Sequence, residues 1–387
     1  YKSFESKYEN FLVLYASKAF TSPAFYRIIK EEGLGLDVVS GGEIYAAILS
    51  GFPMEKVYFH GNNKSDSELE MALDNKLGRI VVDNFYEMAR LNHLSREKGL
   101  TADILLRITP GIEANTHEYI QTGQVDSKFG FTLTNGQALQ AIISLSNFPN
   151  LSFKGIHCHI GSQVFDLGFY RKTTEIMLDF MMQIKEKTGL ICQELNLGGG
   201  FGIYYTKQDH PFSIKTYVEE ICNLVIDFSL KQNYPQPKIV IEPGRSIIGP
   251  AGTTLYTVGS IKDIPGIRKY IAVDGGMSDN PRPALYQAQY EATIANKANL
   301  KKAVKVSVAG KCCESGDMLI WDIMLQEPKS GDILALTSTG AYVYSMSNNY
   351  NSLPRPAVIL VREGKASLII KRETYQQIFQ NHLLPEI

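Results

Sequence analysis

The sequence has 387 residues, of which 44% are hydrophobic and 20% charged, and its formal net charge of −1 argues against nucleic acid or an anionic membrane surface as a partner. No apolar run reaches the roughly 18 residues of a membrane-spanning helix, and the polar first residues, Tyr1 to Asn10, contain no signal-peptide region. The five cysteines are odd in number and include no CxxC pair, so we expect a cytoplasmic protein with neither a disulfide framework nor a structural zinc site.

Short apolar runs alternate with helix-like segments over the first two thirds of the chain. Eight runs are expected to form strands: Phe11–Ala16, Leu36–Ser40, Val57–His60, Arg79–Asp83, Ile104–Thr109, Phe153–Ile160, Leu195–Leu197 and Ile239–Glu242. Near-continuous apolar strands separated by helices, such as Phe169–Lys187 and Ser213–Gln232, are typical of a parallel sheet covered on its faces. Eight such units predict a (β/α)₈ TIM-type barrel. A doubly wound open sheet is the alternative, although no GxGxxG follows the first run.

After Pro250, strand-like runs follow one another with Gly, Pro and Asn turns between them. These runs are Thr253–Ile261, Lys269–Val273, Val304–Ala309, Ile333–Thr337, Ala357–Arg362 and Ala366–Lys371. The pattern predicts a mainly antiparallel β domain, built as a sandwich or a barrel. We therefore place the (β/α)₈ barrel at residues 1–248 and the β domain at 249–387, with a packed junction between them.

Polar and glycine residues follow the predicted barrel strands, where the catalytic groups of such barrels lie. They are Lys18, Asp37, Asn62, Arg107, His157, His159, Gly198–Gly200, Glu242 and Arg245. Among them, Lys18 ends an apolar strand and should be partly buried. Burial lowers the pKa of an amine, and a neutral amine can form a Schiff base with an aldehyde. The alternative is a lysine that extends its charged end into solvent.

Gly198 to Gly202, GGGFG, directly follow the seventh predicted strand. Successive glycines allow backbone N–H groups to approach an anion closely, as a phosphate site requires. A tight turn from strand to helix is the alternative. Lysine, glycine loop and barrel together indicate a phosphate-bearing aldehyde cofactor.

Two histidines, His157 and His159, would face the same side of a strand, so joint metal ligation is geometrically possible. No acidic cluster accompanies them in the sequence, which argues against a metal site. The alternative is an imidazole ring that lies flat against a cofactor, with Ser162 donating to a phosphate.

Glu242 and Arg245 lie three residues apart in the segment EPGRS and could form an ordinary surface ion pair. In a pyridoxal phosphate site, a carboxylate that faces the pyridine nitrogen keeps that nitrogen protonated. The ring then accepts electrons strongly, as decarboxylation requires. Arg245 would be available for a substrate carboxylate.

In the predicted β domain, Cys313 to Asp317, CESGD, combine a thiol, two acids and a flexible glycine. An ordinary turn with a buried thiol is the alternative interpretation. Residues 279–286 form a proline-rich loop that displays Arg282 and Tyr286, and its stiffness suits a binding contact.

Together these segments resemble the fold-type III, alanine-racemase-like family of pyridoxal phosphate decarboxylases. The resemblance rests on ten motifs in family order: YASKAF, LDVVSGGE, FHGNNK, SKFGF, HCHIGSQ, LNLGGGFG, IEPGRSI, DGGMSDNPRPALY, CESGD and GAYVYSMSNNYN. They span nearly the whole chain, from Tyr15 to Asn351.

The resemblance implies pyridoxal 5'-phosphate as cofactor and a role for each matching residue. Catalytic roles would fall to Lys18, which carries the cofactor as a Schiff base, His159, which stacks on its ring, and Cys313, which controls protonation. The implied cofactor-binding residues are Lys18, Asp37, His159, Ser162, Gly198, Gly199, Gly200, Glu242, Gly244, Arg245 and Tyr342. The implied substrate-binding residues are Arg245, Arg282, Tyr286, Glu314 and Tyr342. Asp37 and Arg107 would support the lysine, and no metal is implied.

The reaction that the resemblance implies is decarboxylation of meso-2,6-diaminopimelate to L-lysine and carbon dioxide, in a homodimer whose β domains contribute substrate and dimer contacts. Cys313 would reach the site of the partner subunit. Ornithine, arginine or a carboxylated polyamine are alternative substrates, and a non-catalytic pyridoxal phosphate carrier is an alternative function. Carriers of that kind lack a β domain with CESGD, and a plain diamine does not need Arg282. One departure is that family members have several dozen residues before the lysine, whereas Lys18 lies near the start of this sequence.

Overall fold

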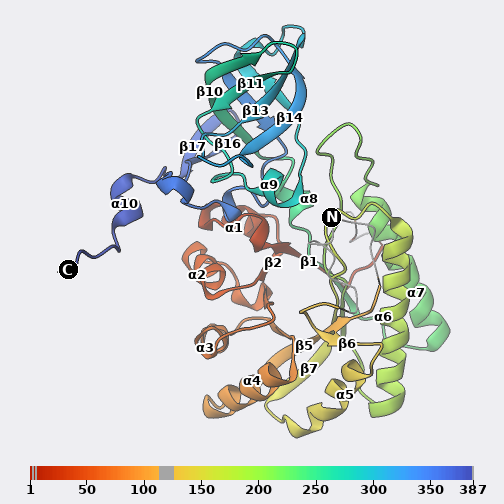
Figure 1. The fold of residues 1–387 in the computed structure, drawn as a ribbon. Helices are drawn as coiled ribbons and strands as arrows, with labels where there is room; N and C mark the ends of the chain where they lie inside the picture. Colours follow the sequence, from red (N-terminus) through yellow and green to blue (C-terminus); the bar gives the residue numbers. More distant parts are fainter. Residues whose placement is uncertain (2–3, 5–6, 113–125, 386–387) are drawn as a thin grey trace. The chain divides into compact units, whose positions relative to one another are not determined.

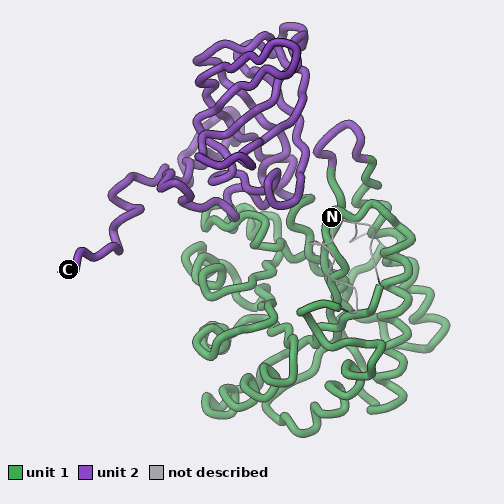
Figure 2. Tube along the Cα trace, viewed as in Figure 1, with its two compact units in different colours: residues 1–203, 210–246 green, residues 204–209, 247–387 purple. Residues whose placement is uncertain are grey.

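The computed structural model describes residues 1, 4, 7–112 and 126–385 and divides the chain into two compact units. Unit 1 comprises residues 1–203 and 210–246, and unit 2 comprises residues 204–209 and 247–387 (Figure 2). Residues 204–209, which the sequence placed within the barrel, therefore cluster with the second unit. Among the described residues, no helix combines the length and the apolar composition needed to cross a bilayer.

Unit 1 contains a closed barrel of parallel strands, which confirms the predicted fold class. The strands of the ring are β1 (Phe11–Ala16), β2 (Gly35–Val38), β3 (Val57–Phe59), β4 (Arg79–Val82), β5 (Ala102–Thr109), β7 (Leu151–His157), β8 (Glu194–Asn196) and β9 (Lys238–Ile241). Each overlaps one of the predicted runs, with ends that differ by up to three residues, and β7 ends at His157, so His159 lies after the strand and not on it. The ring closes because β1 pairs with both β2 and β9, while β4 pairs with β5. The short strand β6 (Phe131–Thr132), which was not predicted, pairs with β5.

Helices lie outside the strands of unit 1 (Figure 1). They are α1 (Pro23–Glu31), α2 (Gly41–Ser50), α3 (Asp66–Asp74), α4 (Phe85–Glu97), α5 (Gln137–Ser144), α6 (Leu167–Thr188) and α7 (Ile214–Gln232). The short helix α8 (Arg245–Ile248) contains the boundary between the two units. Local sequence explains several of their ends. A capping box between Ser65 and Glu68 begins α3, and Gly189, with a φ of 73°, ends α6.

The barrel interior is apolar, and its amino-terminal end is sealed by a charged cluster. The apolar side chains come from five different strands: Leu14, Tyr58, Val81, Leu105 and Val240. At the amino-terminal end, the buried carboxylate of Glu194 accepts hydrogen bonds from Arg79 (2.5 Å), Tyr58 (2.9 Å) and Lys238 (3.1 Å). This end of a barrel serves stability, so chemistry is expected at the opposite, carboxyl end.

Unit 2 is a mainly antiparallel β structure, as predicted. Its six-stranded sheet has the order β12 (Ala292–Ile294), β15 (Ile333–Thr337), β10 (Thr253–Ile264), β11 (Arg268–Val273), β13 (Val304–Ala309) and β14 (Met318–Leu325). Only the β11–β13 pair is parallel among these pairings. A separate hairpin joins β16 (Val358–Arg362) and β17 (Lys365–Ile370), and two short helices are α9 (Arg282–Tyr286) and α10 (Tyr375–Phe379).

Two strands of unit 2, β12 and β14, were not predicted. The segment that forms β14 reads MLIWDIML, and periodicity alone does not distinguish such a short apolar run from a helix. Strand β12 has three residues, too few for an alternating pattern. β12 is a strand because it pairs with β15, which is distant in the sequence, and β14 pairs with the strand before it, β13.

Candidate active site

Three predicted site residues are brought to one end of the barrel by the pairing of β1. Lys18 lies in a 3-10 turn (Ser17–Ala19) directly after this strand. In the register of the sheet, Ala16 lies opposite Asp37 of β2, and Val13 lies opposite Ile241 of β9. The Ala16 N–H also donates to the Pro243 carbonyl at 3.2 Å. Lys18 and Glu242 therefore leave adjacent strands at the carboxyl end.

The strands β5, β7 and β8 contribute three more polar residues to the same end. Arg107 lies opposite His157, and His157 lies opposite Asn196. His60 directly follows β3. The strand-end rule thus identified the correct end of the barrel, although His60 and Asn196 were not among the predicted site residues.

Glu242 is the centre of a buried polar cluster. Its Oε1 accepts a hydrogen bond from Asn196 Nδ2 at 2.7 Å and lies 3.0 Å from His60 Nε2. Its Oε2 lies 3.2 Å from His157 Nε2. The Glu242 N–H donates to the Gly198 carbonyl at 2.8 Å, which ties the carboxylate to the glycine loop.

The cluster keeps Glu242 charged and His157 neutral. Burial by itself would raise the pKa of the Glu242 carboxyl, but His60 and His157 hold that pKa well below its usual range. Burial lowers the pKa of His157 to about 4, although Glu242 opposes the shift. Burial and the positive charge of Lys18 also lower the pKa of His159 well below its ordinary value. Near pH 7 the site therefore contains the Glu242 carboxylate next to an uncharged His157 ring.

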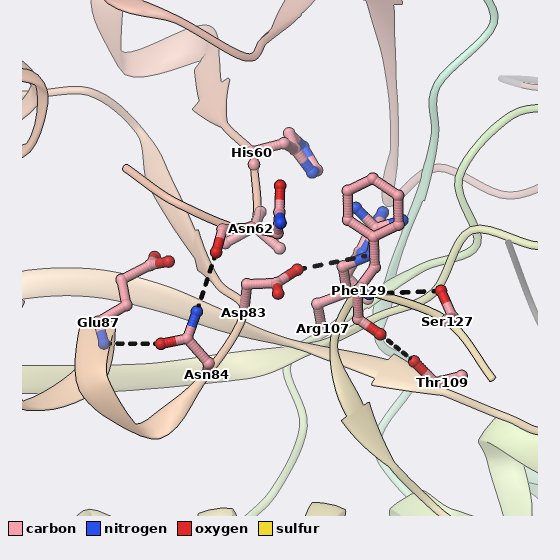
Figure 3. A network of polar contacts seen from close by, with 12 residues as sticks. His60, Asn62, Asp83, Asn84, Glu87, Arg107, Thr109, Ser127 and Phe129 are labelled. Atoms are coloured by element: carbon pink, nitrogen blue, oxygen red, sulfur yellow. Dashed lines mark hydrogen bonds and ion pairs between the residues drawn. The ribbon is translucent and has the colours of Figure 1, made fainter. Parts of the chain in front are cut away.

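Figure 3 shows the neighbouring polar network, to which His60, Asp83 and Arg107 contribute. Arg107 Nε lies 3.9 Å from Asp83 Oδ1, and its guanidinium carbon lies 4.2 Å from the centre of the Phe129 ring. Burial lowers the pKa of Arg107, while Asp83 opposes that shift. Burial raises the pKa of Asp37, whose Oδ1 lies 3.7 Å from His60 Nε2.

The glycine loop after β8 is required by close backbone packing as well as by its conformation. Gly198 and Gly200 have φ angles of 67° and 97°, which favour glycine. A Cβ on Gly199 would lie 2.1 Å from the Glu242 carbonyl oxygen. Both alternatives considered from the sequence, a tight turn and an anion-binding loop, are therefore compatible with these glycines.

In and near the glycine loop, some backbone N–H groups donate hydrogen bonds to residues of the chain, and others have no acceptor among the described residues. The Gly198 N–H donates to Asn196 Oδ1 at 2.9 Å, and the Gly199 N–H donates to His159 Nδ1 at 3.1 Å. Within the described ranges, the N–H groups of Gly200 and buried Gly244 have no acceptor. Gly244 is buried, whereas Gly200 is partly exposed, and buried N–H groups without a partner are rare in proteins. These two donors, near a lysine and a buried carboxylate, fit a phosphate-bearing aldehyde such as pyridoxal phosphate.

Ser162 and Arg245, two of the predicted cofactor-binding residues, are hydrogen-bonded to each other. Arg245, at the start of α8, donates to Ser162 Oγ from Nη2 at 2.8 Å and from Nε at 3.3 Å. Arg245, which follows β9, thus contacts Ser162, which follows β7. An anion that engages Ser162 would therefore also meet a positive charge.

Of the predicted substrate residues in unit 2, Arg282 has the most informative surroundings. It is 6% exposed, donates to the Tyr290 hydroxyl at 2.5 Å and lies over the Tyr205 ring at 4.7 Å. No carboxylate of the described residues forms an ion pair with it. A buried guanidinium normally has an anionic partner. Tyr286 lies on the same short helix, α9.

The CESGD segment places Cys313 and Glu314 on the surface of unit 2. Buried Asp317 organises the turn, because its carboxylate accepts from the N–H groups of Met277 and Cys312, both at 2.7 Å. The segment is thereby linked to the loop that carries Arg282. Tyr342 has a φ of 60°, an uncommon conformation that often marks functional sites.

The histidines that the sequence offered as possible joint ligands have different partners. His157 faces Glu242, whereas His159 accepts from Gly199. The side chains of His60, His157 and Glu242 do bring ligand-type atoms within 4.8 Å of one another. Within this group, His157 is hydrogen-bonded to Glu242, and His60 Nε2 lies 3.0 Å from Glu242 Oε1.

Several contributing residues were missed from the sequence. These are His60, Asn196, Tyr205 and Tyr290. His60 ends a predicted strand and could have been found by the strand-end rule. Asn196 and Tyr205 act through partners that are distant in the sequence, Glu242 and Arg282, which no local pattern identifies, whereas Tyr290 lies eight residues after Arg282.

The comparisons with known proteins agree on one family for this chain. Residues 1–249 match the family model of the pyridoxal binding domain of pyridoxal-dependent decarboxylases. Diaminopimelate decarboxylase of Bacillus subtilis is 56% identical over 95% of this chain and 83% of its own. The crystal structure of diaminopimelate decarboxylase from M. jannaschii is 36% identical, with a TM-score of 0.92 over 99% of this chain and 87% of that chain. Its complex with L-lysine has a TM-score of 0.90 at 35% identity, over 100% of this chain and 88% of that chain.

Proposed function

We propose that this chain, which belongs to the diaminopimelate decarboxylase family of pyridoxal-dependent decarboxylases, converts meso-2,6-diaminopimelate to L-lysine and carbon dioxide as a cytoplasmic homodimer. The observation that carries the proposal is the buried, charged Glu242 at the barrel end that also bears Lys18. That pair suits a cofactor whose ring nitrogen must stay protonated. The relatives described above support the substrate.

Different residues of the barrel would bind different parts of the cofactor. When bound, pyridoxal 5'-phosphate supplies an electron-accepting ring that stabilises the carbanion left by loss of carbon dioxide. Lys18 would hold the aldehyde end, and Glu242 would accept a hydrogen bond from the ring nitrogen. His159, uncharged at neutral pH, would lie against the ring without repelling a protonated nitrogen.

The phosphate would bind where the unused donors lie. The N–H groups of Gly200 and Gly244 supply two backbone donors, and Ser162 supplies a hydroxyl already oriented by Arg245. Gly198 and Gly199 would then act through loop shape, because their own N–H groups are occupied. The resemblance adds Tyr342 as a further phosphate ligand. Asp37 would support Lys18, whose charge stabilises its carboxylate.

Substrate recognition would depend on unit 2. The buried Arg282 has aromatic neighbours and no carboxylate partner among the residues described, so a substrate carboxylate would complete its environment. Tyr286 and Glu314 would contact the distal amino-carboxyl end, and Arg245 the remaining polar groups. Cys313, exposed on its own chain, would act in the site of a second copy.

The direct test of this function is turnover by the purified protein with pyridoxal 5'-phosphate. Incubation with meso-2,6-diaminopimelate should release carbon dioxide and L-lysine in equal amounts, measured by trapping labelled gas and by chromatography. L-ornithine and L-arginine serve as comparison substrates and should react far more slowly. Equal turnover of ornithine would contradict the proposed substrate while leaving the reaction type in place.

The shared site predicts rescue between two inactive variants. Lys18→Ala and Cys313→Ala should each be nearly inactive, because each damages every site of its own homodimer. After mixing and subunit exchange, about half of the dimers contain one chain of each kind. Such a dimer has one doubly damaged site and one intact site, so activity should return to roughly one quarter of the unmodified level.

Activity and subunit exchange must be measured on the same samples, the latter by mass spectrometry of differently tagged chains. If verified exchange restores no activity, Cys313 does not act in the partner's site. A Cys222→Ala chain, which alters a buried thiol of the barrel, is the matched control and should be active before mixing.

A further inference from the structure

Two histidines that the proposed mechanism leaves without a role enclose the Glu242 carboxylate. We infer that His60 and His157 are positioning residues, which hold Glu242 as a charged and oriented acceptor for the ring nitrogen of the cofactor. The inference rests on the proposed function only for the identity of the cofactor. It does not depend on the substrate.

The contacts enclose the carboxylate from several strands. His60 Nε2 lies 3.0 Å from Glu242 Oε1, and His157 Nε2 lies 3.2 Å from Glu242 Oε2, so each ring lies next to a different carboxylate oxygen. The two rings touch edge to face, with centroids 4.8 Å apart. Asn196 adds a third donor at 2.7 Å. With three elements contacting it, the carboxylate has little freedom to rotate.

The surroundings of the rings indicate which nitrogen carries the proton. His157 Nδ1 is buried without a hydrogen-bond partner among the described residues. An unpaired buried N–H is more costly than an unpaired lone pair of a ring next to a carboxylate, so the proton belongs on Nε2, facing Glu242. Both rings are almost fully buried, so bulk solvent does not reach them.

The contacts around Glu242 determine whether its buried carboxyl group is ionised. A buried carboxylate tends to take up a proton, and a protonated Glu242 could not accept from a protonated ring nitrogen. Hydrogen bonds with His157 and Asn196, together with the His60 ring 3.0 Å from Oε1, stabilise the ionised form. Removing one imidazole would therefore weaken the contact with the ring nitrogen even if the barrel remained folded.

The test compares two cofactors that differ at one atom. Pyridoxal 5'-phosphate has the ring nitrogen, and its 1-deaza analogue has a C–H group in that position. We would measure the dissociation constant of each from apoprotein by absorbance titration, for the unmodified chain, His60→Leu and His157→Leu. His157→Gln, which can retain a side-chain N–H donor, is the conservative variant, and His93→Ala, on the barrel surface, is the control.

The expected result is selective loss. His60→Leu and His157→Leu should weaken binding of pyridoxal 5'-phosphate by about tenfold or more, as for loss of a hydrogen bond to a charged group. Binding of the deaza analogue should change little in the same variants. His157→Gln should recover much of the affinity for the natural cofactor, and His93→Ala should match the unmodified chain.

Equal weakening for both cofactors would overturn the inference, since it would show a general effect on barrel packing. Unchanged affinity for both would overturn it as well. Thermal unfolding of each apoprotein identifies a variant that has not folded, and the Gln variant then decides the question. Failure of the proposed function would appear elsewhere, as absent turnover of diaminopimelate by an unmodified chain that still binds the cofactor.

Discussion

Lys18→Ala is expected to abolish both turnover and covalent attachment of pyridoxal 5'-phosphate. Without this amine, no side chain placed by β1 at the carboxyl end of the barrel can bind the aldehyde. The unmodified protein should be yellow, and borohydride reduction should attach the cofactor permanently to the peptide that contains Lys18. Peptide mapping by mass spectrometry measures the attachment, and release of lysine measures turnover.

A matched lysine serves as the control for this experiment. Lys172 is exposed on helix α6, so Lys172→Ala should retain colour, label and turnover. Label on a different lysine of the unmodified protein, or no label at all, would show that Lys18 is not the attachment site. The proposed cofactor role of Lys18 would then be wrong.

Arg282→Ala should cause a similarly large loss, but with a different signature. If Arg282 binds the distal carboxylate, its removal leaves that charge unpaired, at a cost of about 2–5 kcal/mol. This corresponds to a fall in kcat/KM of roughly 30-fold to several-thousand-fold. Colour and borohydride labelling should persist, because Lys18 and Glu242 are unchanged.

Another arginine of unit 2 provides the comparison. Arg268 also lies near an aromatic ring, 4.8 Å from Trp321, and forms an ion pair with Asp322. Arg268→Ala should leave kcat/KM for diaminopimelate within a few-fold of the unmodified value, as for most exposed ion pairs. If Arg282→Ala behaves in the same way, or if lysine is decarboxylated as fast as diaminopimelate, the carboxylate contact does not exist.

The architecture of unit 1 could be predicted because its determinants are local. Each barrel strand is a short apolar run between helices, and a parallel sheet buried on both faces requires such runs. The ends of these runs also located Lys18, Arg107, His157 and Glu242 at one end of the barrel. In unit 2, the strands with clear turns on both sides were predicted, whereas β12 and β14 were not.

The sequence by itself therefore determined the barrel, the β domain and the end at which the polar residues gather. Only the tertiary structure decided how those residues pair. Sheet register brings Asn196 next to His157, and the loop after β9 places Glu242 between two imidazoles. Likewise, Ser162 meets Arg245, and the Gly244 N–H has no acceptor among the residues that the structure describes. The physical reason is that the alternation of residues along a strand predicts only which side chains share a face. Which of these side chains come into contact depends on strand register and on barrel closure, and both are set by the whole barrel.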